Sequence, residues 1–155
     1  MRLTRQSTYA LRTLVYCAVS APGLSRIADV AVANGISELF LFKLIKPLVE
    51  NGLLETVRGR KGGIRLGRPA EEISVLDVIR HTEDSFALAE CFESRSDIHC
   101  PLAGNCDLSG VLNEALAAFF EVLDGYSIAD LARKRSSLRL RLGLGSDEPA
   151  PAAAH

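Results

Sequence analysis

Apolar residues recur with a helical period along the first part of the chain. Leu14 and Val15 follow Leu11 by three and four positions, so a helix would place all three on one face. We expect this first helix to cover about residues 4–20. Its early arginines and apolar stretch loosely imitate a secretory signal peptide, but Arg12 interrupts that stretch. We therefore expect a helix that stays attached to a cytoplasmic protein.

Two further short helices are indicated by their capping residues and by the turns between them. Ser25 can cap a helix through about residue 33, and the Asn-Gly pair at 34–35 supplies turn chemistry that ends it. Ser37 can cap the next helix, which runs toward residue 50 and ends at another Asn-Gly pair. Two short helices around a glycine-containing turn are typical of a helix-turn-helix.

A β-hairpin is predicted directly after these helices. Residues 53–57 and 64–66 form two short apolar runs, and "RGRKGG" between them carries three positive charges and three glycines. A basic hairpin that follows a helix-turn-helix is the element order of a winged helix-turn-helix. We therefore assign residues 1–69 to a DNA-binding domain of this type.

The second half of the chain is predicted to be helical. Ser74 and Asp77 make a capping box before an apolar run. A later helix over about residues 107–124 carries a wide apolar stripe, which comprises Leu108, Leu112, Ala115, Leu116, Phe119, Phe120 and Leu123. Residues 143–155 are polar and rich in Ala and Pro, as in a disordered tail. The expected fold is mainly α with a small β-hairpin, namely a winged helix-turn-helix plus a long helix.

Charge is distributed unevenly between the two halves of the chain. The composition is 48% hydrophobic and 24% charged, with a net charge of −1. Residues 1–70 hold 11 Lys/Arg against 4 Asp/Glu, whereas residues 71–155 hold 7 against 15. A basic half on a nearly neutral chain indicates a surface for an anion, and nucleic acid is the leading candidate.

Candidate DNA contacts lie on the hairpin tip and on the second helix of the helix-turn-helix. Basic residues at the tip would sit against phosphates. On the helix, apolar residues would face the core, and the residues of its other side would face the major groove. The candidates are Ser37, Glu38, Lys43, Lys46, Arg58, Arg60 and Lys61. The alternatives are a solvated charged turn and, for Glu38, a first-turn carboxylate favoured by the helix dipole.

The four cysteines fall into two groups. Cys17 lies in the apolar first helix, where a free cysteine is expected to be a small buried hydrophobe. Cys91, Cys100 and Cys106 share one loop with the spacing C-x8-C-x5-C. In a reducing cytosol, clustered cysteines favour metal or redox chemistry over structural disulfides.

Three cysteines leave several chemistries open. A structural zinc site normally has C-x2-C pairs and four protein ligands. His99 is a poor fourth ligand because it adjoins Cys100, and neighbouring residues seldom converge on one metal. Ligation by three thiolates suits an iron–sulfur cluster whose remaining iron is held from elsewhere. A dithiol redox switch is the alternative.

The sequence resembles the bacterial winged-helix iron–sulfur regulators that include IscR, NsrR and RirA. The matching segments are "MRLTRQSTYALR" at the start, "GLLETVRGRKGGIRLGRP" at the hairpin, and the loop with Cys91, Cys100 and Cys106. The resemblance covers about residues 1–135. Within the family, "SELFLFK" and "TEDSFALAECFE" look closest to the rhizobial iron-responsive repressor RirA.

This resemblance implies a homodimer in which the helix over about residues 107–124 crosses between subunits. Residues 70–135 then hold the cluster-binding loop and the dimerisation helix. The three loop cysteines would hold a [4Fe–4S] cluster, with [2Fe–2S] as the alternative. In NsrR a carboxylate from the partner's first helix completes the cluster, but the matching residue here is Thr8, a poor iron ligand. Glu90, His81, His99, a small-molecule thiol or water are the candidates for that ligand.

The function that we predict is a transcriptional repressor whose operator affinity depends on the cluster and reports iron availability. The first alternative is a nitric-oxide or cluster-biogenesis sensor of the same family. Alternatives of another class are an iron–sulfur enzyme or electron carrier, and a zinc-stabilised DNA-binding module. The sequence has no nucleotide-binding glycine motif and no convergent acid/base pair, so we do not expect an enzyme.

Overall fold

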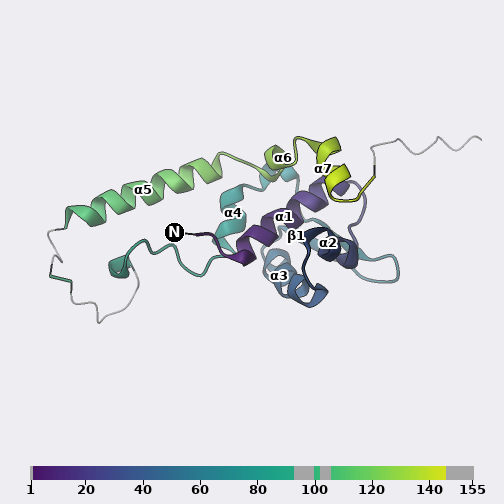
Figure 1. Ribbon diagram of the computed structural model, residues 1–155, viewed down its shortest axis with the longest axis horizontal. Helices are drawn as coiled ribbons and strands as arrows, with labels where there is room; N and C mark the ends of the chain where they lie inside the picture. Colours follow the sequence, from purple (N-terminus) through teal and green to yellow (C-terminus); the bar gives the residue numbers. More distant parts are fainter. Residues whose placement is uncertain (1, 93–99, 102–105, 146–155) are drawn as a thin grey trace, which may run out of the picture.

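A computed structural model of the chain describes residues 2–92, 100–101 and 106–145. Helix α1 (Arg5–Ser20) lies at the centre of the main body, with α2, α3 and the two-stranded hairpin on one side and α4, α6 and α7 on the other (Figure 1). It begins where the Thr4 hydroxyl accepts the backbone N–H of Ser7 at 3.2 Å. The predicted first helix is therefore confirmed.

The helix-turn-helix is also confirmed. Helix α2 (Ile27–Asn34) ends at Gly35, whose φ of 63° lies in the left-handed region that favours glycine. Helix α3 (Glu38–Glu50) begins where the Ser37 hydroxyl accepts the backbone N–H of Phe40 at 3.2 Å. The two helices pack on α1 and on each other.

The hairpin, hereafter the wing, consists of β1 (Leu54–Val57) and β2 (Gly63–Leu66), paired antiparallel with Leu54 opposite Leu66. Ser25 pairs with Ile64 of β2 in an isolated antiparallel β-bridge. Its N–H donates to the Ile64 carbonyl at 2.9 Å, and its carbonyl accepts the Ile64 N–H at 2.8 Å.

The prediction that Ser25 caps α2 is therefore wrong. Ser25 is extended because β2 uses its backbone groups, so the helix begins two residues later and Arg26 occupies the N-cap position without a side-chain cap. The carbonyl of an N-cap residue accepts the first hydrogen bond of its helix. The Ser25 carbonyl already accepts the Ile64 N–H, and the Arg26 carbonyl accepts the Val30 N–H at 3.1 Å instead.

One hydrophobic core joins the winged part to elements near the C-terminus. Its members include Ala10, Leu14, Val30, Leu41, Leu44, Ile45, Leu48, Leu53, Ile64, Ile73, Val78 and Ile128. The predicted apolar face of α3 (Leu41, Leu44, Ile45 and Leu48) is buried as expected. Most of its outward side remains exposed, and this is the side on which DNA contacts were predicted.

Helix α4 (Val75–Arg80) follows the 3₁₀ turn η1 (Ala70–Glu72) and begins with the predicted capping box of Ser74 and Asp77. A second 3₁₀ turn, η2 (Glu90–Phe92), lies beyond it. Helix α5 (Asp107–Asp124) matches the predicted range and extends away from the main body, with only its C-terminal part near α4 (Figure 1).

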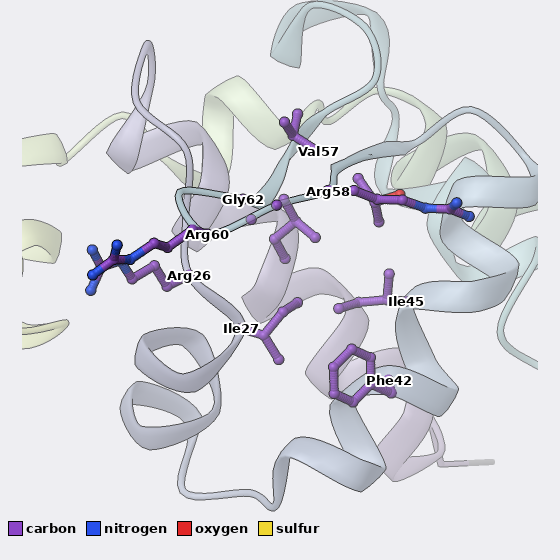
Figure 2. Close-up of a pocket in the computed structure, with 12 residues that line it drawn as sticks. Arg26, Ile27, Phe42, Ile45, Val57, Arg58, Arg60 and Gly62 are labelled. Atoms are coloured by element: carbon purple, nitrogen blue, oxygen red, sulfur yellow. The ribbon is translucent and has the colours of Figure 1, made fainter.

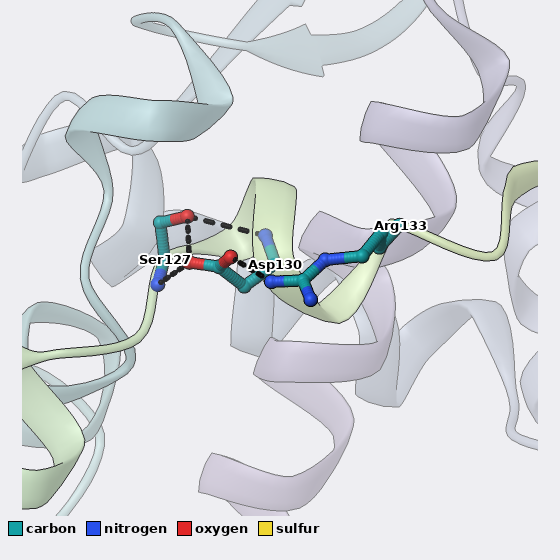
Figure 3. A network of polar contacts seen from close by, with 3 residues as sticks. All are labelled: Ser127, Asp130 and Arg133. Carbon is teal, nitrogen blue, oxygen red and sulfur yellow. Dashed lines mark hydrogen bonds and ion pairs between the residues drawn. The ribbon is translucent and has the colours of Figure 1, made fainter.

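The chain returns to the main body through α6 (Ile128–Leu131), which places Ile128 in the core. Its cap is a polar network in which Asp130 accepts the Ser127 N–H at 3.0 Å, the Ser127 hydroxyl at 2.7 Å and an Arg133 N–H at 2.6 Å (Figure 3). These donors, the Ser127 backbone first, lower the pKa of Asp130 to about 2.

Helix α7 (Arg135–Arg141) was not predicted from the sequence. Arg139 donates to the Val19 carbonyl at 3.1 Å, and Leu142 and Leu144 pack against the core. This segment therefore packs against the C-terminal end of α1. Most of the predicted tail, residues 146–155, lies outside the described residues.

Candidate nucleic-acid interface and cysteine loop

The outward face of α3 carries the four candidate residues of this helix. Ser37, Glu38, Lys43 and Lys46 are all exposed. Lys46 forms a 3.9 Å ion pair with Glu50 one turn later, but both side chains are largely in water, so this pair contributes little to stability. The lysines are therefore free to move toward an anionic ligand at small cost.

The wing presents its three basic candidates at the tip. Arg58, Arg60 and Lys61 are exposed, and among the described residues no carboxylate forms an ion pair with them. The tip is shaped by glycine. A Cβ at Gly62 would lie 2.2 Å from the Val57 carbonyl oxygen, so only glycine fits there.

Arg65, on strand β2 of the same wing, is instead paired. Its guanidinium donates to the two carboxylate oxygens of Glu55 at 2.9 and 3.0 Å. These hydrogen bonds lower the pKa of Glu55. The basic residues at the wing tip therefore have no ion pair within the described part of the chain, whereas Arg65 on β2 is paired with Glu55 of β1.

An open groove of about 830 Å³ separates α3 from the wing. Its lining includes Arg26 and Ile27 at the start of α2, Phe42 and Ile45 on α3, and the wing tip. Figure 2 shows Arg26 and Arg60 extending toward the same side of the groove, with Arg58 on the other side. The groove thus joins the candidate helix and the candidate wing in one continuous surface.

Arg26 is a candidate that sequence reasoning missed. The Ser25–Ile64 backbone pair fixes this residue beside the wing. A Cβ at Gly63 would lie 2.5 Å from the Ser25 carbonyl oxygen, so glycine permits this close approach. The one signal in the sequence was the Gly-Gly pair at 62–63, which is compatible with many tight contacts.

A second group of arginines surrounds the start of α1. Arg5 and Arg12 lie 5.7 and 5.3 Å from the centre of the Tyr9 ring, and Tyr9 packs edge-on against Phe40 of α3 at 5.8 Å. Thr8 lines a shallow pocket beside these residues. Its hydroxyl donates to the Thr4 carbonyl at 3.0 Å, as expected of a hydroxyl inside a helix.

All four cysteines are free thiols. Cys17 is 3% exposed in the core, and burial raises the pKa of its thiol to about 12. This burial agrees with the predicted structural role, because a thiol that stays protonated is a poor ligand and nucleophile.

The loop cysteines lie outside the core. Cys91 is exposed within η2, Cys100 is half-buried, and Cys106 is half-buried at the N-cap of α5. Across the described ranges, no three His, Cys, Asp or Glu side chains gather closely enough to hold a metal ion. Most of the loop between the cysteines lies outside these ranges, including His99.

The start of this loop is tied to two other parts of the fold. The Glu83 carboxylate accepts the Thr4 backbone N–H at 2.7 Å and the Ser7 hydroxyl, so it binds the N-terminus of α1. Ser7 also bonds to the Thr82 hydroxyl at 2.8 Å, out of contact with water. Three residues after Glu83, Phe86 packs edge-on against Phe120 of α5 at 4.9 Å.

Comparison with known proteins identifies the family. The model of the Rrf2 family, described as an iron-dependent transcriptional regulator, matches residues 3–134. The chain belongs to the Rrf2 family of transcriptional regulators. The resemblance stated from the sequence is thereby confirmed, and so is the fold expected from it.

Relatives of known sequence cover almost the whole chain. Protein aau3 of Rhizobium meliloti is 56% identical over 149 residues, which are 96% of this chain and 95% of that protein. The HTH-type transcriptional regulator NsrR of Bacillus licheniformis is 44% identical over 140 residues, which are 90% of this chain and 97% of that protein.

Two solved structures of other proteins share the fold. The oxidized form of Staphylococcus aureus CymR is 31% identical, with a TM-score of 0.68, and the match covers 85% of this chain and 96% of CymR. T. potens IscR has a TM-score of 0.69 at 24% identity over 90% of this chain and 91% of IscR, which is evidence for the fold alone. Across the described part of the chain, no helix has the length and apolar character needed to cross a bilayer.

Proposed function

We propose that this Rrf2 protein is a homodimeric repressor whose operator affinity is controlled by an iron–sulfur cluster and reports iron availability. The observation that carries the proposal is the position of the cysteine loop. It joins the winged part to α5, and its first residues bond to α1 through Glu83 and pack on α5 through Phe86. A change in the loop would therefore act on both elements.

The DNA-binding step rests on the continuous surface formed by α3, the groove and the wing. Ser37, Glu38, Lys43 and Lys46 would face the major groove, where the N-terminal part of such a helix reaches base edges. Arg58, Arg60 and Lys61 would contact phosphates beside it, and Arg26 joins them because it lines the same groove. Phosphate contacts of this kind set the position of the helix on the duplex.

The chemistry of the donors favours an iron–sulfur cluster. Cys91, Cys100 and Cys106 are free, lie outside the core and belong to one loop, and soft thiolate ligands select iron–sulfur clusters or zinc. When bound, a [4Fe–4S] or [2Fe–2S] cluster would cross-link the loop in a way that depends on iron supply. The remaining ligand would come from Glu90, His81, His99, a small-molecule thiol or water.

The residues around the loop would transmit the difference between the cluster-bound and the cluster-free loop to the rest of the protein. With the thiols ligated, Cys91 in η2 and Cys106 at the start of α5 would be tied to one group. Loss of that tie would leave the Phe86–Phe120 contact and the Glu83 bonds to α1 as the connections, within the described residues, between this segment and the two helices. The two winged parts of a dimer must engage half-sites about one helical turn apart, so a small reorientation lowers simultaneous binding.

Dimerisation through α5 is supported by its unpartnered face. Leu108, Val111 and Val122 are 59, 61 and 60% exposed. Together with the exposed Ala115 and Ala118 they follow the alternating three- and four-residue spacing of a coiled-coil seam. A second copy of α5 would bury this seam, which otherwise leaves three large apolar side chains in water.

The test is anaerobic reconstitution followed by DNA binding at controlled iron. Brown protein with matching iron and sulfide counts supports the cluster, whereas colourless protein that contains zinc supports a structural module. Gel shifts then compare the cluster-loaded dimer with the same dimer after iron removal. Equal operator affinity of the two forms would contradict the proposal.

A different signal for the same loop is the second candidate. NsrR proteins are 38 to 44% identical to this chain, and CymR has been solved in an oxidized form. Separate exposure of the loaded protein to an iron chelator, nitric oxide and an oxidant distinguishes the three signals. Iron sensing requires that the chelator alone, in the absence of oxidant, changes the affinity of the protein for its operator.

A further inference from the structure

The outward face of α3 contains two large apolar side chains that the packing of the fold does not use. Leu39 is 69% exposed and Phe42 is 54% exposed. They are three positions apart, so they are neighbours on one face of the helix. The buried side chains of α3, among them Leu41 and Leu44, point the opposite way.

Single exposed apolar residues are ordinary on protein surfaces. This pair differs because its surroundings are cationic. Lys43 and Lys46 lie on the same outward face, and Phe42 lines the groove together with Arg26 and the arginines of the wing (Figure 2). An apolar protein partner would have to bury these cations without compensation, whereas duplex DNA supplies phosphates for them. Charge complementarity therefore favours DNA as the occupant.

The floor of the major groove offers one large apolar group, the C5-methyl of thymine. The other groups on the base edges are hydrogen-bond donors and acceptors. Leu39 and Phe42 can make neither kind of hydrogen bond. Both lie in the first two turns of α3, the part of such a helix that reaches base edges.

We infer that Leu39 and Phe42 read thymine methyl groups, and that each operator half-site carries thymine opposite the start of α3. The inference rests on the proposed function and specifies how its DNA surface selects sequence. Discrimination by these two residues is apolar, so it is independent of salt, unlike the phosphate contacts of the wing. Glu38 and Lys43, on either side of the pair, remain available for polar contacts.

The experiment removes the methyl group and leaves every hydrogen bond of the base in place. Duplexes are first enriched from a randomised library with the full chain, reconstituted anaerobically or depleted of iron, whichever form binds more tightly. Each thymine of the enriched half-site is then replaced in turn by deoxyuridine, which has hydrogen in place of the methyl group. Affinity is measured for the wild type, Leu39→Ala and Phe42→Ala.

At one or two thymines, deoxyuridine is expected to weaken wild-type binding about fourfold, the value for one buried methyl group. The matching alanine variant should bind thymine and deoxyuridine equally at that position. Leu140→Ala is the control, because Leu140 is 79% exposed on α7, away from the α3 face, and it should keep the wild-type sensitivity.

Four results would overturn the inference. Wild-type protein that tolerates deoxyuridine at every position does not use the methyl groups, although its DNA binding would still support the proposed function. Alanine variants that keep the full sensitivity exclude these two residues. A change in oligomeric state on Leu39→Ala, measured by sedimentation, shows that a second copy of the chain covers this face. Failure of the full chain to enrich any duplex would overturn both the inference and the proposed function.

Discussion

Replacement of Arg60 by alanine tests the wing contact most directly. Arg60 is exposed at the wing tip and extends toward the same side of the groove as Arg26 (Figure 2). If its guanidinium binds a phosphate, each lost contact lowers the slope of log K against log salt by about 0.9. The proposed homodimer would carry two copies of the residue, so the expected decrease in slope is about 1.8.

The same slope sets the expected loss of affinity. Relative to about 1 M salt, where counterion release contributes little, a slope change of about 1.8 amounts to about 60-fold at about 0.1 M salt. At about 0.4 M salt it amounts to only about fivefold. The loss should be similar for all duplex sequences, because phosphates carry no sequence information.

Fluorescence anisotropy titrations across this salt range measure both quantities. Arg65→Ala is the matched control, since it removes the same charge from the same wing but takes away a guanidinium already bonded to Glu55. Its slope should remain that of the wild type. Equal slopes for Arg60→Ala and Arg65→Ala would refute the phosphate contact and leave only a long-range effect of net charge.

Four further predictions concern the loop, the dimer and the fold. Cys100→Ala should lose bound iron and sulfide and the iron response of DNA binding while keeping its circular dichroism spectrum; a response that persists contradicts the ligand assignment. Val111→Glu should shift the protein toward monomer in analytical ultracentrifugation, because the charge enters the exposed apolar seam of α5, and an unchanged dimer excludes that seam. Gly63→Ala should lower the free energy of unfolding by about 1–3 kcal/mol in urea titrations, because the added Cβ meets the Ser25 carbonyl oxygen. Asp130→Asn should be less stable than the wild type at neutral pH, and the difference should shrink as the pH falls from about 4 toward 2.

The sign of the last prediction follows from the direction of the pKa shift. The pKa of Asp130 in the folded protein is lowered from 3.8 to about 2. Its ionised form is therefore favoured by folding, and the stabilisation is present above the unfolded pKa and is lost as pH falls through the folded one. A difference between wild type and variant that does not depend on pH would contradict this account.

Local signals in the sequence were sufficient for most of the secondary structure. The caps at Ser37 and Ser74 and the range of α5 were predicted from spacings of three and four residues and from turn chemistry. The two strands of the wing followed from short apolar runs around a glycine-rich turn. Such features depend on residues close in the chain, so one sequence contains the information needed to find them.

The cysteine loop could be predicted from the sequence only in part. The sequence alone supplied the three thiols, their spacing and the distinction from Cys17, whose burial the structure then showed. The attachment of the loop through Glu83 to the start of α1 was not predicted. Its partners, Thr4 and Ser7, are distant in sequence, and a single half-buried glutamate has no periodicity that points to them.

The sequence by itself thus determined the helix-turn-helix, the basic wing and the set of possible cluster ligands, because these depend on residue type and short spacing. Only the tertiary structure decided that Ser25 pairs with Ile64 instead of capping α2, that Arg26 joins the wing, and that Leu39 and Phe42 remain exposed. The physical reason is competition between partners. Ser25 can satisfy its backbone groups at a helix start or at a strand edge, and the choice depends on where β2 lies once the core around α1 has formed.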